Sequence, residues 1–232
     1  MGKDYTFTSL TRMKKFYVMI EKLATVSQQL THGHYVELLL LTDINKIRYY
    51  ILTSEQQNLS IRQLRNKIKN NEYERLNQET KLKLINNEQS NVVDFVKNPI
   101  LIKNSYSNIK ISEKILQKLI LENIESFMKE LGTNFSFIGS EYKIKIGDRY
   151  NCIDLLLFNY EYNCFVVVEL KVTELKKEHI GQIEVYMNYV DNNLKNINHD
   201  KNIGIIICRK ENKYVIEYCS DNRIIAREYE LV

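Results

Sequence analysis

Three charged residues lie on two neighbouring apolar segments in the second half of the 232-residue chain. Asp154 stands between Ile153 and a run of three leucines, and the segment CFVVVELKV carries Glu169 and Lys171 two residues apart. An ionised carboxylate inside an apolar strand costs free energy unless a cation or hydrogen bonds compensate it. Side chains two apart on a strand point to the same face, so Glu169 and Lys171 should emerge together. If the two segments form a hairpin, Asp154 approaches Glu169.

Two carboxylates and one ammonium at one point of a sheet predict metal-dependent chemistry. Adjacent carboxylates raise each other's pKa unless a cation neutralises them, and their oxygens suit Mg²⁺, with Mn²⁺ as a substitute. Such an ion lowers the pKa of a bound water and stabilises charge on a phosphodiester, while Lys171 orients the nucleophile or supports the phosphorane. The alternative is a structural salt bridge between Glu169 and Lys171, because D-x(n)-E-x-K alone is a permissive pattern.

The elements that must position these residues predict an α/β sandwich with a mixed sheet. Ser112 can cap a helix whose apolar face runs from Ile115 to Leu131, and Gly132 supplies its stop. Another helix is expected from about Glu174 to Asn192. The expected strands are 135–138, 142–146, 150–158, 164–171, 203–208, 214–218 and about 224–229.

Residues 1–76 predict a mainly α-helical N-terminal domain, followed by a linker over 77–111 that is rich in Asn, Lys and Gln. Ser60 and Gln63 fit the capping-box pattern at the start of one helix. Beyond that cap, Arg62, Arg65 and Lys69 fall on a different face from the apolar stripe and form a candidate nucleic-acid-binding surface. An ordinary solvated helix face is the alternative.

Composition excludes several classes of protein and leaves others open. The net charge of +4 is modest, and the 4 cysteines include no C-x-x-C pair, so neither a zinc site nor a disulfide framework is indicated. No apolar run approaches the roughly 20 residues that span a bilayer, and the N-terminus lacks the apolar stretch of a signal peptide. We therefore expect no membrane partner and a cytoplasmic location. His32 and His34 are interpreted as local hydrogen-bonding groups.

The order of these elements resembles the PD-(D/E)xK nuclease core, and residues 112–232 resemble the YhcG family. The resemblance rests on ESFMKELGTNFSFIG, YNCIDLLLFNYEYNCFVVVELKV, GQIEVYMNYVD and NIGIIIC, in that order. It implies a restriction-endonuclease-like fold with Asp154, Glu169 and Leu170 at the metal and Lys171 as the catalytic lysine. It also implies Gln182 as an active-site residue. A glutamate of the first helix is expected to join them, and of Glu122 and Glu125 we favour Glu122.

The N-terminal half resembles the N-terminal domain of the same family in SLTRMKKFY, QLTHGHYVELLL, KIRYYIL and LSIRQLRNKI. His32 and Leu59 stand where that family commonly has tryptophan, which leaves specific N-terminal contacts open. The resemblance implies binding of nucleic acid or of a protein partner. The expected function is a metal-dependent DNA endonuclease of repair, recombination or defence, with a homodimer as a hypothesis. The alternative is a non-catalytic binding module on a nuclease fold. Glycoside hydrolysis by the carboxylate pair is a weaker hypothesis, because it gives Lys171 no role.

Overall fold

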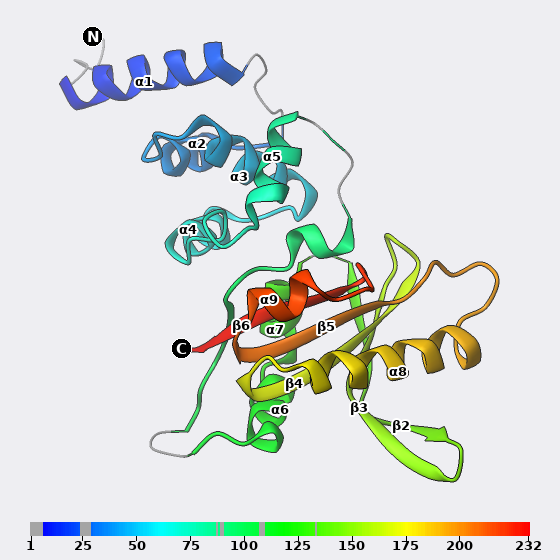
Figure 1. Cartoon of the computed structure of the whole chain (residues 1–232). Coiled ribbons are helices and arrows are strands. Elements are labelled where there is room, and N and C mark those ends of the chain that lie inside the picture. The colour runs from blue at the N-terminus through cyan, green and yellow to red at the C-terminus, as the bar shows by residue number, and fades with distance from the viewer. Residues whose placement is uncertain (1–6, 24–28, 87, 89–90, 107–109, 133) are drawn as a thin grey trace. The chain divides into compact units, whose positions relative to one another are not determined.

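The computed structural model describes residues 7–23, 29–86, 88, 91–106, 110–132 and 134–232 (Figure 1). The chain divides into two compact units, Met1–Ser90 and Asn91–Val232. In the described part of the chain, no helix is long and apolar enough to cross a membrane.

The N-terminal unit is helical, as its sequence predicts, and its core gathers around Leu38, Tyr50 and Leu64, which are fully buried. The capping box is present: Ser60 Oγ accepts from the Gln63 N–H, and Gln63 Oε1 accepts from the Ser60 N–H at 2.8 Å. The helices of this unit are α1 (Phe7–Leu23), α2 (His32–Leu38), α3 (Ile44–Gln56), α4 (Ile61–Lys69) and α5 (Gln78–Asn86).

The segment 77–111, expected as a linker, contains regular structure on both sides of the division between the units. The helix α5 belongs to the N-terminal unit, where Thr80 is buried. The 3-10 helix η1 (Val92–Phe95) and the strand β1 (Ile100–Ile102) belong to the second unit, where Val96 is fully buried. Short apolar runs alternate here with Asn and Lys, and residues of those runs, such as Val96, are buried in the unit to which they belong.

The C-terminal unit is built on a six-stranded mixed sheet in the order β1-β6-β5-β4-β3-β2. The β2–β3 and β3–β4 pairs are antiparallel, and the β4–β5, β5–β6 and β1–β6 pairs are parallel. Its larger strands are β2 (Phe135–Ile146), β3 (Arg149–Asn159), β4 (Cys164–Glu174), β5 (Ile203–Lys210) and β6 (Ile224–Leu231). The prediction of an α/β sandwich with a mixed sheet is confirmed.

Helices cover both faces of this sheet (Figure 1). On one face, α6 (Glu113–Glu122) and α7 (Ile124–Leu131) bury Leu116, Leu119 and Leu131 against inward residues of the strands. On the other face, α8 (Lys177–Asn193) buries its apolar stripe, and α9 (Lys213–Glu217) lies beside it. This second face carries Val167 of β4, and with it the next two side chains of the same parity, Glu169 and Lys171.

Three sequence predictions differ from the structure in this unit. The single helix expected over 115–131 is divided into α6 and α7 at Asn123, whose φ of −128° leaves the helical region. The two strands expected over 135–146 are one strand with an irregularity between Phe137 and Gly139. The strand expected over 214–218 is wrong: Asn212 caps the helix α9 there by accepting from the Val215 N–H.

Candidate active site

The antiparallel ladder between β3 and β4 ends at the pair Leu155 and Val168, one position before Asp154 and Glu169. Continuing that register places Asp154 opposite Glu169. The backbone groups released there are taken by the two carboxylates: Asp154 Oδ2 accepts from the Leu170 N–H at 2.7 Å, and Glu169 Oε1 accepts from the Asp154 N–H at 3.4 Å. The end of the ladder therefore brings both carboxylates together.

Lys171 and Gln117 complete the contacts of this cluster. Lys171 Nζ donates to Glu169 Oε2 at 3.2 Å, and both side chains are almost wholly buried. Gln117 Nε2, from α6 on the opposite face of the sheet, donates to the Asp154 carbonyl at 3.0 Å. The backbone N–H and carbonyl of Asp154 are thus both hydrogen-bonded by side chains instead of by the backbone of a neighbouring strand.

One ammonium does not balance two carboxylates in this buried setting. Burial raises the pKa of Glu169 to about 7, the Asp154 carboxylate raises it in the same direction, and Lys171 opposes both. Burial also raises the pKa of Asp154, against the lowering effect of the Leu170 N–H and of Lys171. The cluster therefore carries an excess of negative charge whenever both acids are ionised, which a second cation would relieve.

Three further charged or titratable side chains act on this cluster. Glu141 faces Asp154 between the paired positions of β2 and β3, and Glu113 opens α6; both raise the pKa of Asp154. His179, in the first turn of α8, has a pKa lowered by burial and then by the charges of Lys171 and Lys176. Its Nδ1 accepts from the Lys176 N–H at 3.2 Å, so the neutral ring carries its proton on Nε2.

The donors at the end of the ladder fit a divalent cation that prefers oxygen. Asp154 and Glu169 supply carboxylates, and the Leu170 carbonyl faces the same gap as its N–H, because the two groups of one strand residue point to the same side. Carboxylate and carbonyl oxygens suit Mg²⁺ or Mn²⁺ better than Zn²⁺. Among the described residues, no three or more His, Cys, Asp or Glu side chains are grouped for a metal.

The structure does not bring Glu122 to this cluster. Glu122 ends α6, where its carboxylate accepts from the Tyr106 hydroxyl at 2.9 Å and lies 3.8 Å from Lys118 Nζ. Glu113 is at the other end of the same helix, about 13 Å away at the helical rise of 1.5 Å per residue. Glu113 is the residue of α6 whose charge acts on Asp154. Glu125, in α7, pairs with Lys129.

Gln182 lies on the same face of α8 as His179, about one helical turn further along. These residues are three apart, and Tyr186 follows four residues later, so all three share one side of the helix. Gln182 Nε2 donates to the Tyr186 hydroxyl at 3.1 Å. The charge of Lys171 acts on His179, which places the beginning of this face beside the cluster.

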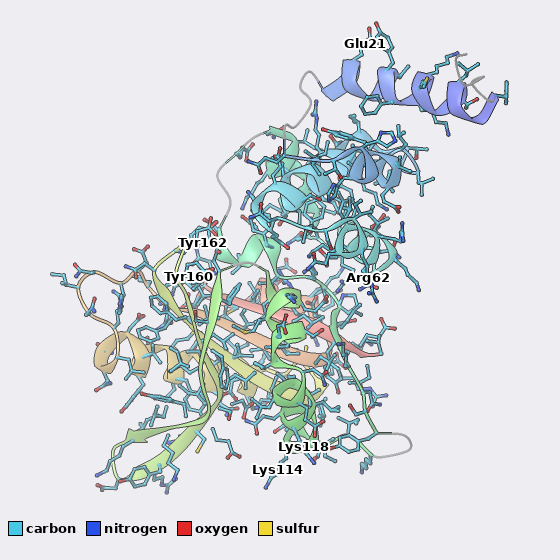
Figure 2. The ribbon with its side chains drawn as sticks, turned by 180° about the vertical axis from the view of Figure 1, so that it is seen from behind. Glu21, Arg62, Lys114, Lys118, Tyr160 and Tyr162 are labelled. Atoms are coloured by element: carbon cyan, nitrogen blue, oxygen red, sulfur yellow. The ribbon has the colours of Figure 1, made fainter. Side chains whose placement is uncertain are left out.

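Three basic residues of α4, namely Arg62, Arg65 and Lys69, are exposed, as their sequence pattern predicts. Arg65 donates to Glu37 Oε1 at 2.7 Å, yet its side chain stays 61% exposed. Arg62 and Lys69 are also exposed, and Figure 2 shows Arg62 on the outer surface of its helix.

In the same unit, His34 hydrogen-bonds through both ring nitrogens, to Thr31 Oγ1 and to the Leu59 carbonyl, each at 2.8 Å, which confirms its role as a hydrogen-bonding group.

Sequence reasoning missed Gln117, Glu113 and His179. A signal for Gln117 was available, because a polar side chain interrupts the otherwise apolar stripe of the first helix between Leu116 and Leu119. Glu113 lies one helical turn before Gln117, on the same side of α6. His179 stands three residues after Lys176 at the start of α8, a spacing typical of a helix N-terminus.

Both halves of the chain match known protein families. Residues 93–232 match the family described as the YhcG PDDEXK nuclease domain, and residues 1–75 match the DUF1016 N-terminal domain. YhcG of Escherichia coli (strain K12) is 24% identical over 227 residues, which cover 91% of this chain and 59% of that protein. This chain therefore spans only about three fifths of the length of that curated relative.

Two solved structures cover part of the chain. A repair endonuclease from Pyrococcus abyssi is 18% identical, with a TM-score of 0.36 over 55% of this chain and 49% of its own. EndoMS in a complex with double-stranded DNA is 20% identical, with a TM-score of 0.37 over 56% of this chain and 48% of its own. The family match covers more than half of the residues, and the chain belongs to the YhcG PDDEXK nuclease family.

Proposed function

We propose that this protein is a divalent-metal-dependent endonuclease that hydrolyses phosphodiester bonds in DNA, with Mg²⁺ as the ion and Mn²⁺ as a substitute. The observation that carries the proposal is the buried cluster of Asp154, Glu169 and Lys171 at the end of the β3–β4 ladder. PDDEXK nucleases generally use divalent metals. Repair, recombination and defence are the processes in which such an enzyme would act.

Asp154, Glu169 and the Leu170 carbonyl would hold the ion. A divalent cation there supplies charge that lowers the pKa of water and offsets charge developing on the phosphate. Lys171, fixed by Glu169, is suited to orient the attacking water and to stabilise a phosphate oxygen. Gln117 and the Leu170 N–H keep the Asp154 segment in place before any substrate arrives.

We propose that Glu113, instead of the expected Glu122, is the glutamate of α6 that acts on the site, because its charge acts on Asp154 while Glu122 is engaged by Tyr106 and Lys118. Gln182 would contact the substrate from α8, since an amide can donate to a phosphate or to the attacking water. Its hydrogen bond to Tyr186 holds the side chain in one orientation.

Exposed basic side chains of the nuclease unit support a polyanionic substrate. On α6, Lys114 and Lys118 point away from the helix (Figure 2). Lys143, Lys145 and Arg149 are exposed near the tip of the β2–β3 hairpin, which projects from the body of this unit (Figure 1). Phosphate contacts of this kind supply affinity without sequence readout.

The N-terminal unit would add contacts to nucleic acid through Arg62, Arg65 and Lys69, or would bind a protein partner. A homodimer would give one active site for each strand of a duplex. Light scattering of the protein with and without DNA tests the dimer, and a monomer mass in both conditions would count against it.

Cleavage of supercoiled plasmid and of branched and single-stranded oligonucleotides tests the proposed function. The reactions contain Mg²⁺, Mn²⁺ or EDTA, and wild type is compared with Glu169→Ala and Lys171→Ala. The proposal expects cutting that requires the metal and is lost in both variants. Tight binding without cutting under every condition would instead indicate a non-catalytic binding module. RNA of matched sequence tests the choice of DNA.

A further inference from the structure

A hollow of about 660 Å³ lies between the first half of α8 and the segment that carries α9. Lys177, Gly181 and Glu184 line it from α8, and Tyr214 and Tyr218 line it from the other side. A Cβ at Gly181 would meet no atom within 4 Å, so no neighbouring side chain covers this part of the wall.

Tyr214 and Tyr218 form an aromatic surface on a firm base. They stand four residues apart, about one helical turn, and the two residues are 75% and 82% exposed. Between them, Val215 and Ile216 pack against the core on the α8 face of the sheet. Both tyrosines are therefore exposed on a segment that packs against the core. Exposed aromatic rings of this kind stack on nucleobases whatever the base sequence.

The hollow is connected to the active-site cluster through the end of β4. Asn212, another lining residue, donates from Nδ2 to Glu174 Oε1 at 3.1 Å. Glu174 follows Lys171 by three residues, a distance of about 10 Å along a strand. Because Lys177, Gly181 and Glu184 lie on the other side of α8 from His179 and Gln182, a strand bound at the cluster must pass the N-terminus of α8 to reach the hollow, several nucleotides away.

The charges of the lining favour a base over a phosphate group. Lys177 and Glu184 are the charged residues among the lining that the structure gives, and they offset each other. A surface for phosphate would carry an excess of Lys or Arg. A carboxylate, by contrast, can accept from the amino group of a base. Because a base inside a duplex has both faces covered by its neighbours, only an unpaired base can enter and stack on a tyrosine.

We infer that this hollow binds an unpaired nucleobase of the substrate strand, stacked on Tyr214 or Tyr218 several nucleotides from the bond that is cut. The inference rests on the proposed nuclease function and narrows its substrate class. The preferred substrates are nucleic acids with single-stranded nucleotides near the cleavage position, such as gaps, flaps or frayed ends.

Binding and cutting test this inference separately. Binding is measured by fluorescence anisotropy in the full chain carrying Glu169→Gln, which prevents cutting, with a labelled single-stranded oligonucleotide and a blunt duplex of the same sequence. The test variant adds Tyr214→Ala and Tyr218→Ala. A second variant adds Tyr214→Phe and Tyr218→Phe, which keep the rings. The control adds Tyr160→Ala, an exposed tyrosine in the β3–β4 turn (Figure 2).

The double alanine variant should weaken single-strand binding by about tenfold or more, as expected for loss of a stacked base, and change duplex binding by less than about twofold. The phenylalanine variant and the Tyr160→Ala control should bind as the parent does. Equal single-strand affinity in the alanine variant and the parent would overturn the inference, as would no single-strand binding by the parent.

Cutting distinguishes failure of the hollow from failure of the proposed function. In the otherwise wild-type chain, Tyr214→Ala with Tyr218→Ala should lower kcat/KM for a gapped duplex by about tenfold and leave that for plasmid nearly unchanged. An equal loss of kcat/KM on both substrates, or no loss on either, would overturn the inference about the hollow and leave the proposed nuclease function intact. If wild type cuts neither substrate with any metal, the proposed nuclease function fails and the binding result alone decides the role of the hollow.

Discussion

A buried charge pair in the N-terminal unit and the charge cluster in the nuclease unit differ in their balance. In the N-terminal unit, Lys67 Nζ donates to both oxygens of Glu72 at 3.0 and 2.9 Å, so one ammonium matches one carboxylate. In the nuclease unit, Lys171 meets Glu169 while Asp154 adds a second carboxylate beside it. A buried pair that is balanced serves the fold, whereas an unbalanced group is costly until a further cation arrives.

The largest expected effect is on cleavage. Glu169→Gln keeps the size of the side chain and removes one negative charge, and it should lower the rate of DNA cleavage about a thousandfold, within the range for loss of a key electrostatic group. Glu72→Gln makes the same chemical change in the balanced pair and should alter the rate by less than about threefold. Single-turnover cleavage at saturating enzyme measures both. Equal losses in the two variants would remove the distinction between the clusters.

The next largest effect is on stability. Here the variant in the N-terminal pair should lose more than the variant in the nuclease cluster. Lys67→Met removes the cation that contacts the buried Glu72 carboxylate, and should lower the free energy of unfolding by about 3 kcal/mol. In metal-free protein, Glu169→Gln removes an unbalanced charge and should leave that free energy unchanged or raise it. Urea unfolding in EDTA, followed by circular dichroism, compares the two. A larger loss in Glu169→Gln would show that its charge stabilises the fold.

A pH dependence follows from the raised pKa of Glu169. Its folded value of about 7 lies above the ordinary value of 4.5, so between these values the folded state holds a proton that the unfolded chain has released. The free energy of unfolding of metal-free protein should therefore fall by about 2 kcal/mol as pH rises from 5 to 8. The difference between wild type and Glu169→Gln isolates this contribution from other groups. A difference that does not change with pH would contradict the raised pKa.

The smallest expected effect belongs to the exposed arginine of the N-terminal unit. Arg62→Ala should weaken DNA binding severalfold, reduce the slope of log affinity against log salt by about one, and leave the single-turnover rate at saturating enzyme unchanged. Arg65→Ala is the matched comparison, because Arg65 already pairs with Glu37. Titrations at several salt concentrations measure both slopes. A changed rate would mean that this unit takes part in the reaction.

The sequence predicted the sheet, its covering helices and the cluster because each depends on local patterns. Asp154 in an apolar strand and the E-x-K spacing are visible without coordinates, and a hairpin brings them together. The roles of Glu113 and Glu122 depend on where α6 lies across the sheet, which neither residue's spacing records. The strand expected over 214–218 became a helix because Asn212 caps it and Val215 and Ile216 dock on the core. Tertiary packing overrode local propensity there.

Direct binding of Mn²⁺ tests the central claim, that the unbalanced cluster is a divalent-metal site. Electron paramagnetic resonance of free Mn²⁺ is followed as protein is added, in the presence of a DNA that Lys171→Met protein cannot cut, with Asp154→Asn in the same background as the comparison. The account predicts that the Lys171→Met protein binds Mn²⁺ and that Asp154→Asn weakens this binding at least tenfold. Equal binding by both proteins, or none by either, would contradict it.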